Sequence, residues 1–380
     1  MMAQAQFSEQ DAKFMALALS LAKRGELSVS PNPSVGCVLV SDQGKLVGQG
    51  FHVRAGEPHA EVIALAQAGS HAKGATAYVT LEPCAHHGRT GPCAQALVNA
   101  GVVKVIAATL DPNPLVAGKG MAMLEQASIH TSSGLMEKHA QAINAAFFTR
   151  MLTKRPYVIL KLAASLDGKT ALANGESQWI TSPQARRDVQ LERARSCAIL
   201  SGSGTVLSDN PRLNVRADEL SPSNAEAFAK RGKQPLRVIV DGQNQLNHHL
   251  HLLQDGQATR VYNHRFDSSI ANDFVTQVQL DRKQNGRHVD LARMLDDLGH
   301  EQINRVWVEA GAKLAGALLD ADLVDELVLY MAPKLLGGNA MELVSTQTKT
   351  HLNQALNAPI SELKQIGPDI KLRCQLKQRG

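Results

Sequence analysis

Hydrophobic and polar positions follow helical and strand periods by turns along this chain, and the pattern starts afresh near residue 156. Before that point, apolar positions at helical spacing flank short apolar runs rich in β-branched residues, a pattern typical of helices packed on both faces of a sheet. The pattern predicts strands over 35–41, 46–50, 75–81 and 103–109 and helices over 8–24, 59–69, 92–100, 118–127 and 134–152. We therefore expect a first domain over 1–150 with an α/β/α layered fold.

A second domain is expected over 156–380, because Lys154, Arg155 and Pro156 interrupt the first pattern and a new apolar run begins at Tyr157. The expected strands are 157–163, 197–201, 236–240, 259–262, 305–309 and 325–332, and the expected helices are 182–195, 289–299 and 311–319. Helices and strands alternate again, so this half is also expected to be α/β. At 380 residues the chain is long enough for each half to bury its own core.

Two short motifs in the first half carry the residues of a zinc site. His59 and Glu61 lie two positions apart at the start of a predicted helix, Cys84 follows a predicted strand, and Cys93 opens the next predicted helix. One imidazole and two thiolates form the ligand set of catalytic zinc, in which a fourth position is left for water. Backbone N–H groups at a helix start also favour a thiolate. We predict His59, Cys84 and Cys93 as zinc ligands and Glu61 as the general acid and base.

A closed structural zinc site is the alternative for this motif. It needs a fourth ligand, which His86 or His87 could supply. A glutamate two residues from the histidine has no role in a closed site, so Glu61 favours the catalytic interpretation.

Composition argues against several classes of protein. The formal net charge is +5, but the basic residues are dispersed and aromatic residues make up only 4%, which argues against a nucleic-acid partner. No apolar stretch of about 18 residues predicts a membrane span, and the first ten residues lack a signal-peptide pattern. Cys37, Cys197 and Cys374 have no disulfide-like spacing and are expected to be reduced. We expect a cytoplasmic protein with small-molecule partners. The sequence does not determine the oligomeric state, and a homo-oligomer is one of the possible states.

The first half resembles the cytidine deaminase superfamily, whose signature is H-x-E followed by P-C-x-x-C. Here eight residues separate Cys84 from Cys93 in place of two. This longer loop resembles the deaminase half of the bifunctional riboflavin-biosynthesis deaminase/reductase family, as do residues 31–36 (PNPSVG) and 50–52 (GFH). The resemblance implies three residues that bind the pyrimidine substrate, namely Asn32, His52 and His86.

Residues 156–340 resemble the reductase half of the same family through 161–168 (KLAASLDG), 175–181 (GESQWIT) and 204–211 (GTVLSDNP). The resemblance implies a dihydrofolate-reductase-like α/β fold and NADPH as cofactor. The implied cofactor contacts are Ala163, Trp179, Thr205, Asp209, Gly311, Ala312, Lys313, Leu314, Ala315, Gly316 and Ala317. The implied contacts with a pyrimidine ribose phosphate are Ser177, Arg193, Leu213, Arg216 and Glu309.

Side-chain chemistry supports some of the residue roles that the resemblance implies. Arg193 and Arg216 can each donate two hydrogen bonds to a phosphate, although Arg193 lies in an arginine-rich helix that would be a solvated face in most proteins. The residue that supplies a proton during reduction stays open among Lys161, Asp209 and Glu309.

Together the motifs predict a two-step enzyme of flavin synthesis. Zinc-dependent hydrolytic deamination of a diaminopyrimidinone ribosylamine phosphate would be followed by NADPH-dependent reduction of the ribosyl group to ribityl. Two alternatives stay open, a zinc deaminase acting on nucleic acid with an RNA-binding second half and a deaminase whose second half binds a pyrimidine without reducing it. The absence of P-C-x-x-C and of a basic stripe argues against the first, and NADPH titration would test the second.

Overall fold

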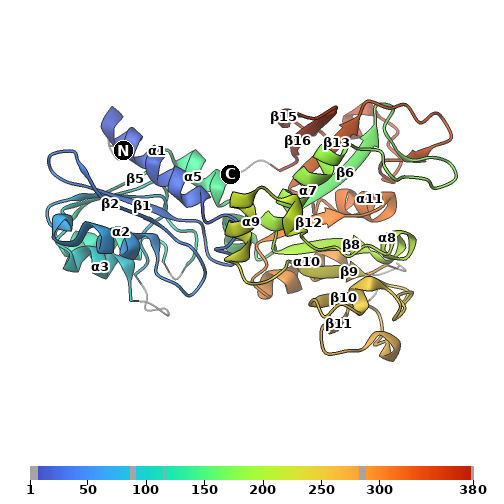
Figure 1. Ribbon diagram of the computed structural model, residues 1–380, viewed down its shortest axis with the longest axis horizontal. Helices are drawn as coiled ribbons and strands as arrows, with labels where there is room; N and C mark the ends of the chain where they lie inside the picture. Colours follow the sequence, from blue (N-terminus) through green and yellow to red (C-terminus); the bar gives the residue numbers. More distant parts are fainter. Residues whose placement is uncertain (1–6, 86–90, 115, 282–287, 378–380) are drawn as a thin grey trace. The chain divides into compact units, whose positions relative to one another are not determined.

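The computed structural model describes residues 7–85, 91–114, 116–281 and 288–377. By its internal contacts the chain divides into two compact units (Figure 1). The first unit runs to Thr153 and also includes Glu226–Gly232, and the second contains the rest of the chain from Lys154 onward. Among the described residues, no helix has both the length and the apolar character that a membrane crossing requires.

The first unit is a five-stranded sheet between two layers of helices (Figure 1). Its helices and strands are α1 (Glu9–Lys23), β1 (Gly36–Val40), β2 (Leu46–Phe51), α2 (Ala60–Ala68), β3 (Thr76–Val79), α3 (Cys93–Asn99), β4 (Lys104–Ala107), α4 (Lys119–Gln126), β5 (His130–Ser133), α5 (Glu137–Ile143) and α6 (Ala145–Thr153). The strand order is β2-β1-β3-β4-β5. Strand β1 is antiparallel to β2 and β3, whereas β3, β4 and β5 are parallel.

Strand β1 is buried on both faces, which is why its sequence is continuously apolar. Cys37 and Leu39 pack in the core shared with α2, α3 and α4, while Val38 and Val40 pack in the core shared with α1 and α5. The α/β/α layering expected from the sequence is therefore confirmed.

The prediction of one continuous helix over 134–152 is wrong. The structure breaks it into α5 and α6 at Asn144, whose buried side chain accepts from the Ser34 N–H at 2.8 Å and donates to the Ser34 carbonyl at 2.9 Å. Strand β5 was missed because its sequence, HTSS, has no apolar alternation. Both differences arise from tertiary contacts that local periodicity does not encode.

The second unit is built on a nine-stranded sheet of order β11-β10-β9-β8-β12-β6-β13-β16-β15. The helices and strands that follow α6 are β6 (Tyr157–Ser165), β7 (Lys169–Ala171), α7 (Pro183–Arg195), β8 (Ala198–Gly202), α8 (Ser203–Asp209), α9 (Pro222–Ala229), β9 (Leu236–Val240), β10 (Thr259–Asn263), β11 (Val275–Gln279), α10 (Leu291–His300), β12 (Arg305–Glu309), α11 (Ala312–Asp320), β13 (Glu326–Ala332), β14 (Met341–Glu342), β15 (Ile360–Ile366) and β16 (Asp369–Gln375). The strands from β11 to β13 are parallel, and β16 and β15 add an antiparallel edge. The α/β class expected for this half is confirmed.

Strand β12 shows how the two faces of this sheet differ. Val306 and Val308 lie in the apolar core that α10 and α11 cover. Arg305 and Glu309 contact residues of α7 on the other face. Alternate residues of one strand therefore serve the core and a polar site, as the pleat requires. The sequence missed α8, α9 and β11, and it missed β15 and β16 because their polar residues hide the strand pattern.

Candidate active sites

Three helix and strand ends bring the predicted zinc ligands together in the first unit. His59 is the N-cap residue of α2, Cys93 is the first residue of α3, and Cys84 follows β3. Their ligand atoms all lie within 4.8 Å of one another. Close packing fixes the start of α2, since a Cβ atom on Gly50 of β2 would lie 2.5 Å from the carbonyl oxygen of Ala60.

The donor set fits zinc. His59 Nδ1 lies 3.2 Å from Cys93 Sγ and 3.7 Å from Cys84 Sγ, close to the roughly 3.5 Å that tetrahedral zinc sets between an imidazole nitrogen and a thiolate. A hydrogen bond from Cys93 lowers the pKa of Cys84 to about 4, whereas the pKa of Cys93 is raised. The two sulfurs thus share one proton, and a bound cation would allow both to be thiolates. Among the described residues the group holds three ligands; His86 and His87 lie outside the described residues.

Glu61 lies in the first turn of α2 and is buried, with 3% of its surface exposed. Burial raises the pKa of Glu61 to about 7, and the neighbouring Cys84 adds to the shift. Glu61 also makes a side-chain contact with Cys93. The helix start therefore places a carboxyl group beside the three candidate ligands, as the H-x-E spacing predicts.

Asn32 and His52 meet next to this site. His52 Nε2 lies 3.0 Å from Asn32 Nδ2, and His52 Nδ1 lies 3.1 Å from the Pro58 carbonyl oxygen. The His52 ring also touches the His59 ring edge to face, with centroids 4.8 Å apart. Burial lowers the pKa of His52 to about 4, so the ring is neutral at pH 7. A neutral ring that donates from Nδ1 to Pro58 accepts the Asn32 amide at Nε2. The third predicted substrate residue, His86, lies outside the described residues.

In the second unit, several predicted cofactor residues gather at the carboxyl ends of parallel strands. Ala163 lies on β6, Thr205 lies on α8 directly after β8, and Gly311 follows β12. The Gly311 N–H donates to Thr205 Oγ1 at 3.2 Å. Helix α11 begins at the next residue, so its N-terminal N–H groups open at this edge of the sheet, a position that suits a phosphate group.

The other predicted cofactor residues differ in how far they are exposed. Trp179 is exposed and its ring lies 4.4 Å under the Arg186 guanidinium, while Asp209 is exposed at the end of α8. Within α11, Ala315 and Gly316 are buried against protein, and a Cβ on Gly316 would lie 1.9 Å from the Ser345 carbonyl oxygen. The remaining residues of the predicted turn are half-buried or exposed, namely Ala312, Lys313, Leu314 and Ala317.

Arg193 and Glu309 form a largely but not fully buried ion pair, with 12% and 17% of their side-chain surfaces exposed. Arg193 Nε and Nη2 donate to the two carboxylate oxygens of Glu309 at 2.6 and 2.9 Å, and Nη1 donates to the Asn214 carbonyl at 2.8 Å. Trp307 Nε1 also donates to Glu309. Burial by itself would raise the pKa of Glu309, but Arg193 and Lys161 outweigh it and hold the pKa at about 2. The carboxylate is thus ionised at neutral pH.

Lys161 is the neighbour of Glu309 across the parallel pair β6 and β12. Burial lowers the pKa of Lys161, and the negative charge of Glu309 opposes this shift. A lysine, a carboxylate and an arginine therefore lie together at one end of the sheet.

The other predicted substrate residues lie at different depths. Leu213 is buried and has a φ of 44°, a left-handed conformation that is rare for leucine and that concentrates at functional sites. Ser177 is half-buried. Arg216 forms a partly exposed pair with Glu219, its Nε lying 2.6 Å from Glu219 Oε1. Arg193 and Arg216 thus have protein carboxylates as partners, and their predicted phosphate contacts stay predictions.

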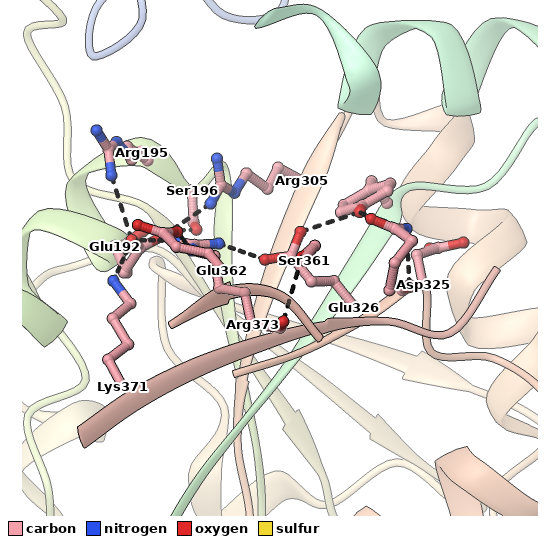
Figure 2. A network of polar contacts seen from close by, with 12 residues as sticks. Glu192, Arg195, Ser196, Arg305, Asp325, Glu326, Ser361, Glu362, Lys371 and Arg373 are labelled. Carbon is pink, nitrogen blue, oxygen red and sulfur yellow. Dashed lines mark hydrogen bonds and ion pairs between the residues drawn. The ribbon is translucent and has the colours of Figure 1, made fainter. Parts of the chain in front are cut away.

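A buried ionic network holds α7, the helix that carries Arg193 (Figure 2). Glu192 is fully buried and accepts from Arg305 at 2.9 Å, from Lys371 at 3.0 Å and from Arg373. Burial alone would raise the pKa of Glu192, but these cations hold it well below its usual range. Glu192, the neighbour of Arg193 in α7, therefore binds residues of β12 and β16, and both strands are far from α7 in the sequence.

Sequence reasoning missed Trp307, Asn214 and the Glu192 network as supports of the second site. Trp307 lies two residues before Glu309, so strand alternation alone could have placed both on one face. Nothing in the sequence around residue 214 or residues 371–373 indicates that these segments meet α7.

Comparison with known proteins matches each half of the chain to a family. Residues 8–109 match the cytidine and deoxycytidylate deaminase zinc-binding region, and residues 156–372 match the RibD C-terminal domain. The riboflavin biosynthesis protein RibD of Escherichia coli K12 is 51% identical over 364 residues, which covers 96% of this chain and 98% of that protein. The chain belongs to the RibD family.

Other RibD proteins are similar along nearly their whole length. The Haemophilus influenzae protein is 52% identical over 97% of this chain and 98% of its own. The structure of Acinetobacter baumannii RibD (form 1) has a TM-score of 0.90 at 45% identity, covering 97% of this chain and 99% of that chain. A Thermotoga maritima deaminase/reductase has a TM-score of 0.85 at 30% identity with the same coverage. The family expected from the sequence and its two-domain fold are thereby confirmed, and the chain is a bifunctional deaminase and reductase of riboflavin biosynthesis.

Proposed function

We propose that residues 1–150 remove an amino group from a diaminopyrimidinone ribosylamine phosphate with one zinc ion per chain. Residues 156–380 then reduce the ribosyl group of the product to ribityl with NADPH. The observation that carries this proposal is the convergence of His59, Cys84 and Cys93 beside the buried carboxyl group of Glu61. The T. maritima relative is described as a diaminohydroxyphosphoribosylaminopyrimidine deaminase and 5-amino-6-(5-phosphoribosylamino)uracil reductase, which supports the choice of substrates.

His59, Cys84 and Cys93 hold the zinc ion in this proposal. When bound, zinc with three protein ligands would lower the pKa of its water to about 7 and so supply a nucleophile at neutral pH. Glu61 would take one proton from the attacking water and deliver it to the ring nitrogen, and it would then carry the second proton of that water to the amino group, which leaves as ammonia. Burial of Glu61 supports this role, because bulk water is kept away from the proton path.

Asn32 and His52 position the pyrimidine ring. His52 spends both ring nitrogens on Asn32 and Pro58, which fixes the orientation of the Asn32 amide. Asn32 can then present Oδ1 to an N–H group of the ring. This arrangement favours a heterocycle with a donor next to the carbon that loses its amino group.

In the second half, we assign the proton transfer to the pair Lys161 and Glu309. NADPH supplies the hydride to C1′ of the sugar. Glu309, held ionised by Arg193, keeps Lys161 protonated, and Lys161 gives its proton to the ring-opening sugar. Asp209 is exposed at the end of α8, which makes it the weaker candidate.

NADPH fits the carboxyl ends of β6, β8 and β12. We place its pyrophosphate at the start of α11, where Gly311 is anchored by Thr205. The exposed ring of Trp179 offers a flat apolar face to one of the cofactor rings.

The test is an assay of the purified full-length chain. We expect about one zinc per chain, ammonia release from the aminopyrimidine phosphate, and NADPH oxidation that depends on that substrate. Cys93→Ala should lose zinc and ammonia release, whereas the control Cys374→Ala removes a buried thiol of the second unit and should keep both. Full zinc content and full deamination in Cys93→Ala would overturn the metal assignment. NADPH that stays unoxidised with the deaminated substrate would show a second half that does not reduce.

A further inference from the structure

We propose that Glu82 is a positioning residue of the deaminase site, whose carboxylate fixes the two chain segments that supply the zinc thiolates. This inference rests on the metal assignment proposed above. Glu82 lies two residues before Cys84, and only 3% of its surface is exposed. A buried carboxylate needs a reason to be there, because leaving water is costly unless its oxygens are fully hydrogen-bonded.

The Glu82 carboxylate accepts four backbone N–H groups from one segment. Oε2 accepts from Asp111 at 3.2 Å and Gly118 at 2.9 Å, and Oε1 accepts from Gly120 at 2.9 Å and Met121 at 3.3 Å. The backbone N–H of Glu82 itself donates to the Thr109 carbonyl at 3.0 Å. The segment that follows β4 is therefore tied to the residue that leads into Cys84.

Only a carboxylate satisfies this arrangement. An ionised carboxylate accepts hydrogen bonds at both oxygens and donates none. Two of the four groups that donate to Glu82 are the N–H groups of Gly120 and Met121, which lie in the first turn of α4. The partial positive charge at a helix N-terminus stabilises a negative group there. A glutamine of the same size would turn two amide hydrogens toward backbone N–H groups.

The same contact reaches both thiolates. A Cβ on Gly120 would lie 1.8 Å from the Pro83 carbonyl oxygen, so α4 abuts the residue next to Cys84. Leu124 of α4 and Leu97 of α3 share one apolar core, and Cys93 begins α3. The N–H of Ala94, the residue after Cys93, donates to the Cys84 carbonyl at 3.1 Å. Glu82 thus acts on Cys84 directly along the chain and on Cys93 through the packing of α4 against α3.

The test is Glu82→Gln in the full-length chain, measured by zinc competition with a chelator and by the absorption of the cobalt-substituted protein. We expect zinc affinity to fall tenfold to a hundredfold, the range typical of residues that orient metal ligands. The cobalt–thiolate absorption should shift, and reduction of deaminated substrate should stay at the parent rate. Glu125→Gln is the matched control, because it removes a charge from an exposed position on the same helix and should change neither metal reading.

Parental zinc affinity and an unshifted cobalt spectrum in Glu82→Gln would overturn the proposal, even if the melting temperature fell. If that variant does not fold, Glu82→Asp decides. It keeps the charge but is one methylene shorter, so we expect weaker zinc binding, and parental binding would count against us. A parent protein that binds no zinc would refute the metal assignment itself, a failure that is visible before any variant is compared.

Discussion

The two candidate sites differ in how their residues are spread along the chain. In the first unit, Glu61 and all three candidate ligands lie between residues 59 and 93, each at or near the end of a helix or strand. In the second unit, Lys161, Arg193 and Glu309 come from β6, α7 and β12. Short-range spacing fixes the first constellation, whereas sheet register and helix packing fix the second. The chemistry of a compact motif can therefore be predicted from residue spacing in the sequence, whereas the chemistry of a dispersed site cannot.

The forces that hold the two sites differ as well. Close backbone contacts hold the first, since Gly50 and Gly120 leave no room for a side chain against α2 and Pro83. Ion pairs hold the second, with Arg193 bound to Glu309 and the fully buried Glu192 bound to a cluster of cations. The ion pairs of the second unit titrate, so its stability should fall in acid.

The largest expected effect separates the two chemistries. Glu61→Gln keeps the side-chain volume but removes the carboxylate that moves the proton. Deamination should fall by about 10² to 10⁴, or about 3 to 5 kcal/mol of barrier. Reduction of already deaminated substrate, followed by NADPH absorbance, should stay close to the parent rate. If both activities collapse in a folded, zinc-loaded variant, the two sites are not independent and the comparison above is wrong.

Next in size is the loss of the buried charge behind the second site. Glu192→Gln leaves Arg305 and Lys371 with less compensation, and we expect the free energy of unfolding of the second unit to fall by about 3 kcal/mol. Urea unfolding followed by reductase activity measures it. Zinc content should not change. An unfolding free energy within about 0.5 kcal/mol of the parent would show that the network contributes little.

The same residue sets an expected pH dependence. The pKa of Glu192 lies well below its ordinary value of 4.5 in the folded protein, because nearby cations favour the ionised form. Its stabilising contribution is therefore present above about pH 4.5 and is lost as the pH falls further. Below that pH the stability of the parent should decrease more steeply than that of Glu192→Gln. Parallel curves would assign acid unfolding to other groups.

A smaller effect is expected at Arg193. Lysine cannot reproduce its two-pronged bond to Glu309, so Arg193→Lys should lower kcat/KM for reduction by about tenfold to a hundredfold, or about 1.5 to 3 kcal/mol. NADPH affinity should move little. A loss in kcat supports the role of holding Glu309, and a rise in KM alone would return Arg193 to the phosphate contact that the family resemblance implies.

The smallest effect is expected at Arg216. Its pair with Glu219 is partly exposed, and such pairs contribute little in water. If protein packing is its main role, Arg216→Lys should change the KM of the reductase substrate by less than about threefold. A tenfold rise in KM at unchanged stability would instead place Arg216 on the substrate phosphate.

The sequence by itself determined the α/β class of both halves and most of the central strands, and it singled out the group of His59, Cys84 and Cys93 that the fold brings together. It did so because buried parallel strands are continuously apolar and because the residue types and short spacing of a zinc-ligand set can be read along the chain. The start of α2 at Ala60 and of α3 at Cys93 lies within one residue of the starts predicted at 59 and 92.

Tertiary structure alone decided the break at Asn144, the polar strands β15 and β16, and the partners of the second site. Asn144 interrupts a helix through bonds to Ser34, which is far away in sequence. The family resemblance implied that Arg193 contacts the substrate phosphate, and the fold pairs it with Glu309. Glu82 shows the same limit, since its four donors belong to a later segment. Periodicity reports which face of an element is buried, but the identity of a polar partner depends on which elements the fold brings together.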